Sequence, residues 1–375
     1  MSAMSTLSIL HTESSIGWGG QEIRILTEAC GMLERGHKVM LLTPPSAEML
    51  PAAKKMGVPV QAIDIAKKRF GPLLSLRAWL AEHGKDYDVI NTHSSTDSWL
   101  TAIACQTLSG MPPIVRTRHV STAINNHWST RWLYTKATAH IATTGEALRA
   151  QLHRDNGYAL DRMTSVRTGI DLNRFQPLDK DAMRAKLRVP ANPTIGILAT
   201  LRDWKGHDYL IDALKLLRTQ FPEWRLIIIG DGPQRARLTS RVQDENLSGI
   251  VRFVGNVDNV PEWLSTLDIF TLPSFGDEGV PQGIMQAMAC GLPVVSTPVG
   301  AIAEAVQDGT TGILVAPKSA HALAGALERL MADEVLRRNM GQAGRAYAST
   351  AFGIDVMLDR MTDVFIRAVM AQKGK

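Results

Sequence analysis

The chain has 375 residues, 45% hydrophobic and 21% charged, and this length and composition predict a globular protein of two domains. No apolar run reaches the roughly 18 residues needed to cross a bilayer, and residues 1–11 lack the basic start and the apolar length of a signal peptide, so we expect neither a membrane span nor export. The formal charge of +5 lies wholly in one half, because residues 1–180 hold 20 Lys and Arg against 15 Asp and Glu.

Short apolar, β-branched runs alternate with longer amphipathic stretches, which is the pattern of βα units on a parallel sheet. In the first half, strands are predicted at residues 7–11, 38–42, 59–63, 89–92, 113–117 and 140–142. A second series follows Pro190, with strands predicted at residues 194–199, 225–230, 250–254, 269–272, 293–297 and 312–315. The sequence therefore predicts an α/β protein with two doubly wound parallel sheets.

Between the two series, residues 167–193 are rich in Pro, Asp and Asn and poor in periodic apolar residues, so a linker is predicted there. Helices are predicted in the tail at residues 334–347 and 354–371, and the second carries an apolar face that needs a surface to cover. The expected parts are a first domain over residues 1–170, a linker over 171–193, a second domain over 194–352 and a final helical segment over 353–375.

The three cysteines, Cys30, Cys105 and Cys290, lie far apart in the sequence. None has a second Cys or a His at the spacing of metal ligands, so neither a disulfide framework nor a zinc site is expected. Each is predicted to be a small buried hydrophobic residue, and a reducing cytoplasm is the compartment that fits best.

Loops after the strands are where chemistry is expected, because helix N-termini and loops converge at the carboxyl edge of an open parallel sheet. The first such loop is Gly17-Trp18-Gly19-Gly20, which precedes a helix beginning near Gln21. Adjacent glycines let the backbone approach a ligand closely, and the helix start offers N–H groups to an anion. Taken alone, the motif fits a simple tight turn equally well.

The second loop, residues 201–207, follows the first strand of the second series and contains Arg202 and Lys205. These cations stand three residues apart and can aim at one diphosphate, Arg202 as a planar fork and Lys205 as a point charge. The alternative is a solvated loop with two unrelated cations.

The third loop runs from Ser274 to Pro293 and is the most informative. Pro281 suits the first turn of a helix, Gly291 suits its end, and the amides of Gly279 and Val280 would face a phosphate at the positive end of the helix dipole. Just ahead of that helix, Glu278 can hold sugar hydroxyls, while Gln286 in the helix can reach a ribose hydroxyl. Separately, Glu278 fits a surface acid that compensates the dipole, and Gln286 fits a neutral helix former.

These loops give the sequence a resemblance to the retaining GT-B glycosyltransferases, in particular glycosyltransferase family 4, over nearly the whole chain. The residues that carry it are Gly19-Gly20, the Arg202/Lys205 loop, Gly230-Asp231-Gly232-Pro233, Phe253-Val254-Gly255 and the segment from Glu278 to Pro293. The resemblance implies two Rossmann-like domains that face each other across a cleft. In such enzymes the C-terminal domain holds a nucleotide sugar, the N-terminal domain holds the acceptor, and the last helix crosses back to the N-terminal domain.

The resemblance also assigns residues. It implies a donor site made of Gly19, Gly20, Arg202, Lys205, Gly255, Glu278, Gly279, Val280, Pro281 and Gln286. The family usually has a second Glu eight residues after the first, yet this chain has Gln286 there. Glutamine still donates and accepts hydrogen bonds to a ribose but brings no charge, so we expect nucleotide binding to survive.

Two histidines complete the predicted site by resemblance. His93 and His119 each follow a predicted strand, and the family often places a functional histidine in the loop that matches His119. His119 is therefore a catalytic candidate together with Arg202, Lys205 and Glu278, and His93 is assigned to the acceptor site with Arg116 and Arg118. Either histidine also fits a hydrogen-bonded structural residue.

Breaking the bond to the sugar develops negative charge on the leaving diphosphate, and stabilising it is the main electrostatic task. This task is assigned to Arg202, Lys205 and the amides of Gly279 and Val280. Neither a metal ion nor another cofactor is expected, because no DxD-type motif stands in a suitable loop. The resemblance implies retention of anomeric configuration by a front-face route, and the two carboxylates of a retaining glycosidase are not found.

Other functions remain open at this point. A sugar-phosphate epimerase or a phosphorylase has the same two-domain plan, but a phosphorylase needs a cofactor lysine and a longer chain, neither of which is found. A non-catalytic nucleotide- or nucleic-acid-binding protein would use the basic first half, although no aromatic-basic interleaving or reading module supports nucleic acid as a partner.

The basic first half also suggests peripheral contact with an anionic membrane, for which Lys67-Lys68-Arg69-Phe70 is the candidate segment. The bland alternative is ordinary solubility charge. The expected partners are thus a nucleotide sugar and a carbohydrate or glycolipid acceptor, in a cytoplasmic enzyme at the inner face of the cell membrane. Assembly of lipopolysaccharide or another surface polysaccharide is the setting that the resemblance suggests.

Overall fold

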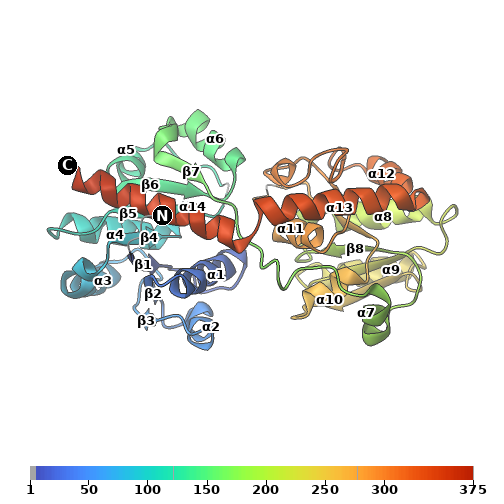
Figure 1. Cartoon of the computed structure of the whole chain (residues 1–375), viewed down its shortest axis with the longest axis horizontal. Coiled ribbons are helices and arrows are strands. Elements are labelled where there is room, and N and C mark those ends of the chain that lie inside the picture. Colours follow the sequence, from blue (N-terminus) through green and yellow to red (C-terminus); the bar gives the residue numbers. More distant parts are fainter. Residues whose placement is uncertain (1–5, 121, 277, 375) are drawn as a thin grey trace. The chain divides into compact units, whose positions relative to one another are not determined.

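The computed structural model describes residues 6–120, 122–276 and 278–374. They form two compact units. The first unit is built from the chain up to Gly169 together with the chain from Ile354 onward, and the second unit is Ile170–Gly353. Each unit is a parallel sheet with helices packed on both faces (Figure 1).

The first unit contains a seven-stranded sheet in the order β3-β2-β1-β4-β5-β6-β7, with every neighbouring pair parallel. Its strands are β1 Ser8–Thr12, β2 Lys38–Thr43, β3 Val60–Ala62, β4 Val89–Thr92, β5 Ile114–Arg118, β6 Thr138–Thr143 and β7 Met163–Ser165. Its helices are α1 Gly20–Glu34, α2 Met49–Lys55, α3 Phe70–His83, α4 Ser95–Gln106, α5 Trp128–Trp132, α6 Glu146–Asn156 and α14 Ile354–Lys373. The strand order reverses between β1 and β4, and doubly wound sheets bind ligands at such a reversal.

The second unit contains a six-stranded parallel sheet in the order β10-β9-β8-β11-β12-β13. Its strands are β8 Thr194–Leu198, β9 Arg225–Ile229, β10 Val251–Gly255, β11 Ile269–Leu272, β12 Val294–Ser296 and β13 Gly312–Leu314. Its helices are α7 Lys180–Leu187, α8 His207–Leu217, α9 Arg235–Asp244, α10 Val260–Ser265, α11 Gln282–Ala289, α12 Ala320–Ala332 and α13 Glu334–Ala351. Here the order reverses between β8 and β11, so the loops after these strands are the ones placed to meet a ligand.

The predicted fold class is confirmed, since both halves are doubly wound parallel sheets. Each of the twelve predicted strands coincides with an observed strand to within two residues. The strand that sequence reasoning missed is β7, which has three residues and lies at the edge of its sheet. Central strands such as β4 and β11 are buried along their whole length, because helices cover both faces of a parallel sheet.

Helix α14 returns to the first unit and packs against α1 and the strands β4 to β6 (Figure 1). Its buried face includes Met361 and Phe365, which join the core formed by β1 and α1. The two helices approach closely at Gly31, where an added Cβ would lie 2.4 Å from a methyl carbon of Leu358. At the rim, Arg35 forms ion pairs with Asp355 and Asp359. The apolar face predicted for the tail thus covers the first unit.

The segment predicted as a linker, residues 171–193, belongs to the second unit and contains helix α7. Asp179 caps this helix by accepting a hydrogen bond from the amide of Ala182. The guanidinium of Arg184 donates to the carbonyl of Thr266 and to the carboxylate of Asp268. This segment is held in the second unit by polar contacts, so its lack of periodic apolar residues did not indicate a linker.

A search of the described helices for an apolar span long enough to cross a membrane finds none.

Candidate active site

In the second unit, the loops that follow β8 and β11 meet at the carboxyl edge of the sheet. Lys205 ends a short 3-10 turn after β8, and its Nζ lies 2.6 and 2.8 Å from the two carboxylate oxygens of Glu278. The hydroxyl of Ser274 donates to the same carboxylate at 2.8 Å. The side chains of Lys205 and Glu278 are 18% and 10% exposed, so this ion pair is largely shielded from water. Two predicted site residues are therefore direct partners.

Close backbone packing holds these loops together. Gly206 has a φ of +79°, and a Cβ there would lie 2.0 Å from the carbonyl oxygen of Pro273. At Gly300, with a φ of +56°, a Cβ would lie 2.1 Å from the carbonyl oxygen of Glu278. The amide of Phe275 donates to the carbonyl of Trp204 at 2.8 Å. A side chain at either glycine would therefore clash with the backbone of the loop after β11.

Arg202 takes a different position from Lys205. Its side chain is exposed, and the guanidinium carbon lies 5.1 Å from the centre of the Trp204 ring, in cation–π range. The sequence predicted that Arg202 and Lys205 both aim at one diphosphate. They share a loop as expected, but Lys205 points to Glu278 because opposite charges attract strongly where water is scarce.

Helix α11 starts beside the same loops. It begins at Gln282, one residue later than predicted, with Pro281 in the N-cap position and Gly279 and Val280 in the preceding loop. At Gly283 a Cβ would lie 2.8 Å from the carbonyl oxygen of Leu198, so the glycine lets the helix start approach the end of β8. Further along the helix, Gln286 is half-buried. Gly255, the remaining donor-site candidate of this unit, ends β10, where its carbonyl accepts from the amide of Gly230.

In the first unit, three histidines form a chain at the carboxyl edge of the sheet. Nδ1 of His11 lies 2.9 Å from Nε2 of His93, and Nδ1 of His93 lies 3.0 Å from Nε2 of His119. Burial lowers the pKa of His11 to about 4, and burial followed by nearby positive groups holds the pKa of His93 and His119 well below the usual value. All three imidazoles are therefore neutral at physiological pH.

Two buried carboxyls stand beside this chain. Asp97 accepts from the backbone amides of His93 and Ser94, both at 2.9 Å, and thereby caps α4. Burial raises its pKa to about 6. Burial and then the charge of Asp97 raise the pKa of Glu13, directly after β1, to about 8. Ser94 and Gln21 both donate to Glu13.

The two arginines assigned to the acceptor site, Arg116 and Arg118, lie on β5 and are both buried. The guanidinium of Arg116 lies over the Tyr134 ring, 4.7 Å from its centre, and Arg118 donates to the Tyr134 hydroxyl at 3.1 Å. Among the described residues, Nε and one terminal nitrogen of Arg116 have no hydrogen-bond partner. A buried cation with open donors is a group that an anionic ligand would satisfy.

Gly19 and Gly20 stand where α1 begins, Gly19 as the N-cap in an extended conformation. They belong to the first unit, as do His93, His119, Arg116 and Arg118, whereas the other donor-site candidates belong to the second. The structure thus gathers the predicted residues into one group per unit, each at the carboxyl edge of its sheet. The described residues contain no group of three or more His, Cys, Asp or Glu placed to hold a metal ion.

Sequence reasoning missed His11, Glu13 and Asp97. A signal was present, because His11 and Glu13 occupy the end of the first strand and Asp97 stands three residues after Ser94 at a helix start. The strand-end rule that selected His93 and His119 applies equally to His11.

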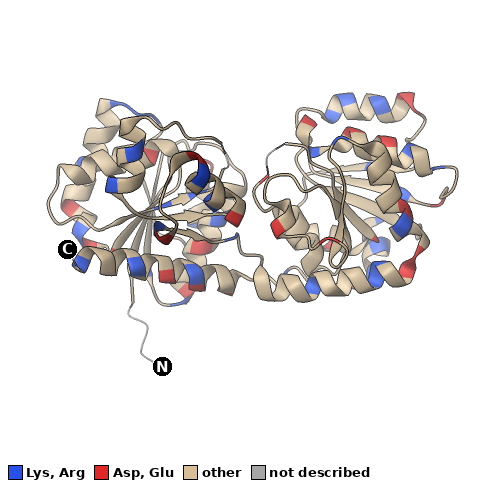
Figure 2. Cartoon of the chain, turned by 90° about the horizontal axis from the view of Figure 1, so that it is seen from above, with Lys and Arg blue, Asp and Glu red and all other residues tan. Residues whose placement is uncertain are grey.

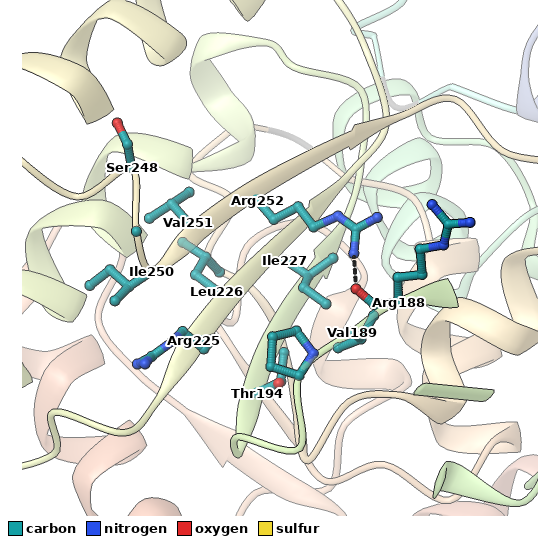
Figure 3. Close-up of a pocket in the computed structure, with 12 residues that line it drawn as sticks. Arg188, Val189, Thr194, Arg225, Leu226, Ile227, Ser248, Ile250, Val251 and Arg252 are labelled. Carbon is teal, nitrogen blue, oxygen red and sulfur yellow. Dashed lines mark hydrogen bonds between the residues drawn. The ribbon is translucent and has the colours of Figure 1, made fainter. Parts of the chain in front are cut away.

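A pocket of about 200 Å³ lies at the opposite, amino edge of the second sheet (Figure 3). Arg188, Arg225 and Arg252 line it over an apolar floor. Arg252 already donates to the carbonyl of Arg188 at 3.0 Å, and Arg225 donates to three carbonyls of the preceding turn. Arg225 and Arg252 are thus engaged in holding loops, and the pocket lies at the edge of the sheet opposite to Lys205 and Glu278.

The comparisons with known proteins agree with this architecture. A crystal structure of a glycosyltransferase from Rickettsia africae has a TM-score of 0.89 at 19% identity, covering 97% of this chain and 99% of that chain. Anabaena Alr3699/HepE in complex with UDP has a TM-score of 0.84 at 21% identity, covering 95% and 99%. These likenesses show that the chain has the GT-B fold.

The family follows from the sequence. Residues 18–174 match the family described as Glycosyltransferase Family 4, and residues 179–347 match Glycosyl transferases group 1. The lipopolysaccharide core biosynthesis mannosyltransferase LpsB of Rhizobium meliloti is 30% identical over 329 residues, which cover 85% of this chain and 86% of LpsB. A phosphatidyl-myo-inositol mannosyltransferase of Mycolicibacterium smegmatis is 29% identical over 335 residues, which cover 85% and 83%. The chain belongs to the group 1, family 4 glycosyltransferases.

Proposed function

We propose that this glycosyltransferase is a retaining, metal-independent enzyme that moves a sugar from a UDP- or GDP-sugar to a carbohydrate or glycolipid acceptor. The observation that carries the proposal is the shielded pair of Lys205 and Glu278 beside the start of α11. It supplies a cation and helix-terminal amides for a diphosphate, and a carboxylate for sugar hydroxyls, within one short region.

The relatives support the substrate classes. LpsB is named for lipopolysaccharide core biosynthesis and the mycobacterial relatives for phosphatidyl-myo-inositol. A further mycobacterial relative, similar over 53% of this chain, is named as dependent on GDP-mannose, whereas Alr3699/HepE was crystallised with UDP and with UDP-glucose. These names support lipopolysaccharide or surface polysaccharide synthesis as the setting, and a UDP- or GDP-sugar as the donor.

The proposed mechanism assigns the residues of the second unit to the leaving group. The bond between the anomeric carbon and the diphosphate oxygen breaks while the acceptor oxygen bonds to the same carbon from the same face. The acceptor proton passes to the departing phosphate oxygen, so no protein nucleophile is needed. Lys205 turns from Glu278 to the diphosphate, Arg202 adds a second cation, and Glu278 then accepts from sugar hydroxyls.

In the first unit, His119 is assigned to the donor sugar or phosphate, and Arg116, Arg118 and His93 to the acceptor. The open donors of Arg116 support an anionic group on the acceptor. Gly19 and Gly20, at the start of α1, are assigned to the donor because a glycine pair lets a ligand approach the backbone closely.

Peripheral membrane contact at the inner face of the cell membrane is a second part of the proposal. Lys67, Lys68 and Arg69 directly precede α3, whose first residue, Phe70, is 74% exposed. Lysine and arginine next to an exposed aromatic side chain are the groups that bind an anionic lipid surface. Elsewhere, Lys and Arg are interspersed with Asp and Glu over the helices of both units (Figure 2), as in ordinary solubility charge.

A thermal-shift panel of UDP-, GDP- and ADP-sugars, followed by a transfer assay on the sugar that binds, tests the proposal. A ligand present at 100 times its dissociation constant stabilises the native state by about 2.7 kcal/mol, so the correct donor raises the melting temperature by a readily measured amount. The configuration of the product, determined by NMR of its anomeric proton, tests retention. An inverted product, or no response to any nucleotide sugar, would refute the proposal.

A further inference from the structure

His11, His93 and His119 come from three different segments, and each imidazole bonds to the next through ring nitrogens. His11 lies on β1, His93 directly follows β4 and His119 directly follows β5. The ring centres are 5.2 Å apart in both pairs, and the planes of His11 and His93 differ by 14°. The ring-centre separation of 5.2 Å is close to the N···N distance of 2.9 or 3.0 Å plus the distance from centre to nitrogen in each ring. This is the geometry of two rings that point at each other along the N···N line. The rings therefore meet edge to edge, as N–H···N hydrogen bonds require.

Because each neutral imidazole carries one nitrogen-bound hydrogen, the two hydrogen bonds must donate in the same direction along the chain. A neutral imidazole has one N–H donor and one bare nitrogen acceptor. His93 uses both of its nitrogens, so it donates to one neighbour and accepts from the other. Either all three rings carry hydrogen on Nδ1, or all three carry it on Nε2.

The inner end of the chain decides between these two states. Nε2 of His11 is fully buried and has no hydrogen-bond partner among the described residues. The neighbouring Phe365 ring is 6.5 Å away, centre to centre, which is too far for its face to accept an N–H from His11. A hydrogen on this nitrogen would be an orphaned donor, and buried N–H groups without a partner are rarer in proteins than under-used acceptors. The hydrogen of His11 therefore belongs on Nδ1.

We propose that His11 and His93 are positioning residues that hold His119 as a neutral imidazole with its hydrogen on Nδ1. In this state His11 donates to His93, His93 donates to His119, and the chain ends in an outward Nδ1–H. No residue that the structure describes bonds to this nitrogen of His119. His119 then offers a hydrogen-bond donor, rather than an acceptor, to an oxygen of the sugar or its phosphate.

This assignment rests on the proposed function, in which His119 faces the donor substrate. A phosphate oxygen and a developing oxyanion can only accept hydrogen bonds, so a bare nitrogen would repel them whereas an N–H stabilises them. Burial, Arg24 and Arg116 all disfavour a charged His119. The amide of His93 is tied to Asp97, which fixes the middle of the chain to the start of α4.

Two-bond nitrogen–proton NMR spectra of the ¹⁵N-labelled full chain read the tautomers directly. His→Gln variants at positions 11, 93 and 119 assign the signals. We expect all three rings to be neutral and to carry hydrogen on Nδ1 at pH 7. A hydrogen on Nε2 of His119, or a charged ring, would overturn the inference, and this readout needs no active variant.

Two variants of nearly equal size at position 93 test the consequence for catalysis. The amide nitrogen of His93→Asn replaces Nδ1 and still donates to His119, whereas His93→Leu makes no hydrogen bond. We expect His93→Leu to lower kcat about 10- to 100-fold, by analogy with the loss of a partner that orients a metal-ligating histidine. His93→Asn should keep the Nδ1–H tautomer of His119 and should lower kcat less than His93→Leu does. Equal losses in both variants would contradict the inference.

His140→Phe is the matched control. His140 is a buried histidine of the same sheet, but it bonds to the hydroxyl of Thr164 and lies outside the chain. We expect it to leave kcat unchanged. If no nucleotide sugar reacts with the wild-type enzyme although the three tautomers are as stated, the proposed function fails and the histidine chain stands. If the wild-type enzyme transfers a sugar but the tautomers differ from those stated, the inference on the histidine chain fails and the proposed function stands.

Discussion

At the scale of single residues, Lys205 and Glu278 neutralise each other in a site where little water reaches them. Breaking such a pair leaves one buried charge without a partner, which costs more than the pair itself contributes. In the mechanism that we propose, the same two groups act apart, one on phosphate and one on sugar. Without a substrate, each group is therefore the ionic partner of the other. A bound substrate would have to offer both groups better partners.

Lys205→Met should lower kcat by about 100-fold or more, because loss of one group that stabilises a developing anion has effects of that size. Glu278→Gln should raise KM for the donor and, combined with Lys205→Met, destabilise the protein less than the two single effects added together. Steady-state kinetics and urea unfolding measure both. The control is Lys215→Met, which removes a half-exposed lysine paired with Glu245. It should change the free energy of unfolding by no more than about 0.5 kcal/mol. Additive single effects on stability would show that the pair is not coupled.

A pH prediction belongs to His140. Burial and then nearby arginines lower its folded-state pKa to about 4 from a usual 6.5. Between pH 4 and 6.5, His140 is protonated in the unfolded state but neutral in the folded state. The contribution of His140 to the free energy of unfolding is therefore fully present above pH 6.5 and is lost as the pH falls toward 4. His140→Phe removes the titrating group. The unfolding free energy of the wild type should therefore fall relative to that of the variant, by at most about 1.4 kcal/mol per pH unit, on acidification from 6.5 to 4. Parallel curves from pH 7 to 4.5 would refute this pKa.

The sequence led to loops that the structure places at the carboxyl edges of the two sheets, but not to their internal contacts. Strand-end position and helix-start position, together with the family resemblance, led to His93, His119, Lys205 and Glu278, since these signals depend only on local pattern. They did not foresee that Lys205 bonds to Glu278, because that contact joins residues 73 positions apart through loop packing. The histidine chain was missed for the same reason, as its members lie 82 and 26 positions apart.

At the scale of elements, the packing of α14 on α1 decides how the first unit is completed. Gly31 gives Leu358 room that no other residue would leave. Leu358 is almost fully buried, so its side chain has little freedom to move aside. The contact is a steric requirement as well as an apolar one.

Gly31→Ala should destabilise the protein by about 1–3 kcal/mol, the usual effect of overpacking, even though alanine is the better helix former. In the control Gly325→Ala, the added methyl in α12 meets nothing within 4 Å, so stability should rise by up to about 1 kcal/mol. Chemical denaturation measures both. In a Leu358→Ala background, Gly31→Ala should destabilise the protein less than it does in the wild type. An equal effect in both backgrounds would mean that the clash lies elsewhere.

Elements with a strong apolar pattern were predictable, and those held by polar contacts were not. The central strand β11 is a continuous apolar or β-branched run, and its prediction is confirmed. Helix α7 was missed because an aspartate cap and the ion pairs of Lys180 and Arg184 with Asp268 hold it. Those partners come from a distant turn, which no local window contains.

At the scale of the whole molecule, the uneven charge of the chain leads to a test of membrane contact. Substituting Glu for Lys67, Lys68 and Arg69 should abolish co-sedimentation with vesicles that contain phosphatidylglycerol, because about 1 kcal/mol per basic residue is lost and repulsion is added. A triple variant at Lys54, Lys55 and Lys38, in the same unit, is the control for net charge. Binding that survives at low salt in the first variant would exclude this segment as the contact.

The two crossings of the chain between the units, at Gly169–Ile170 and Gly353–Ile354, also set an order of assembly. On the ribosome, the whole of the second unit is made before α14, which supplies Met357, Met361 and Phe365 to the core of the first. The unit that is synthesised first must therefore wait with an open apolar face, while the unit that is synthesised second can finish folding ahead of it. We therefore expect the first unit to depend more on chaperones during synthesis than the second.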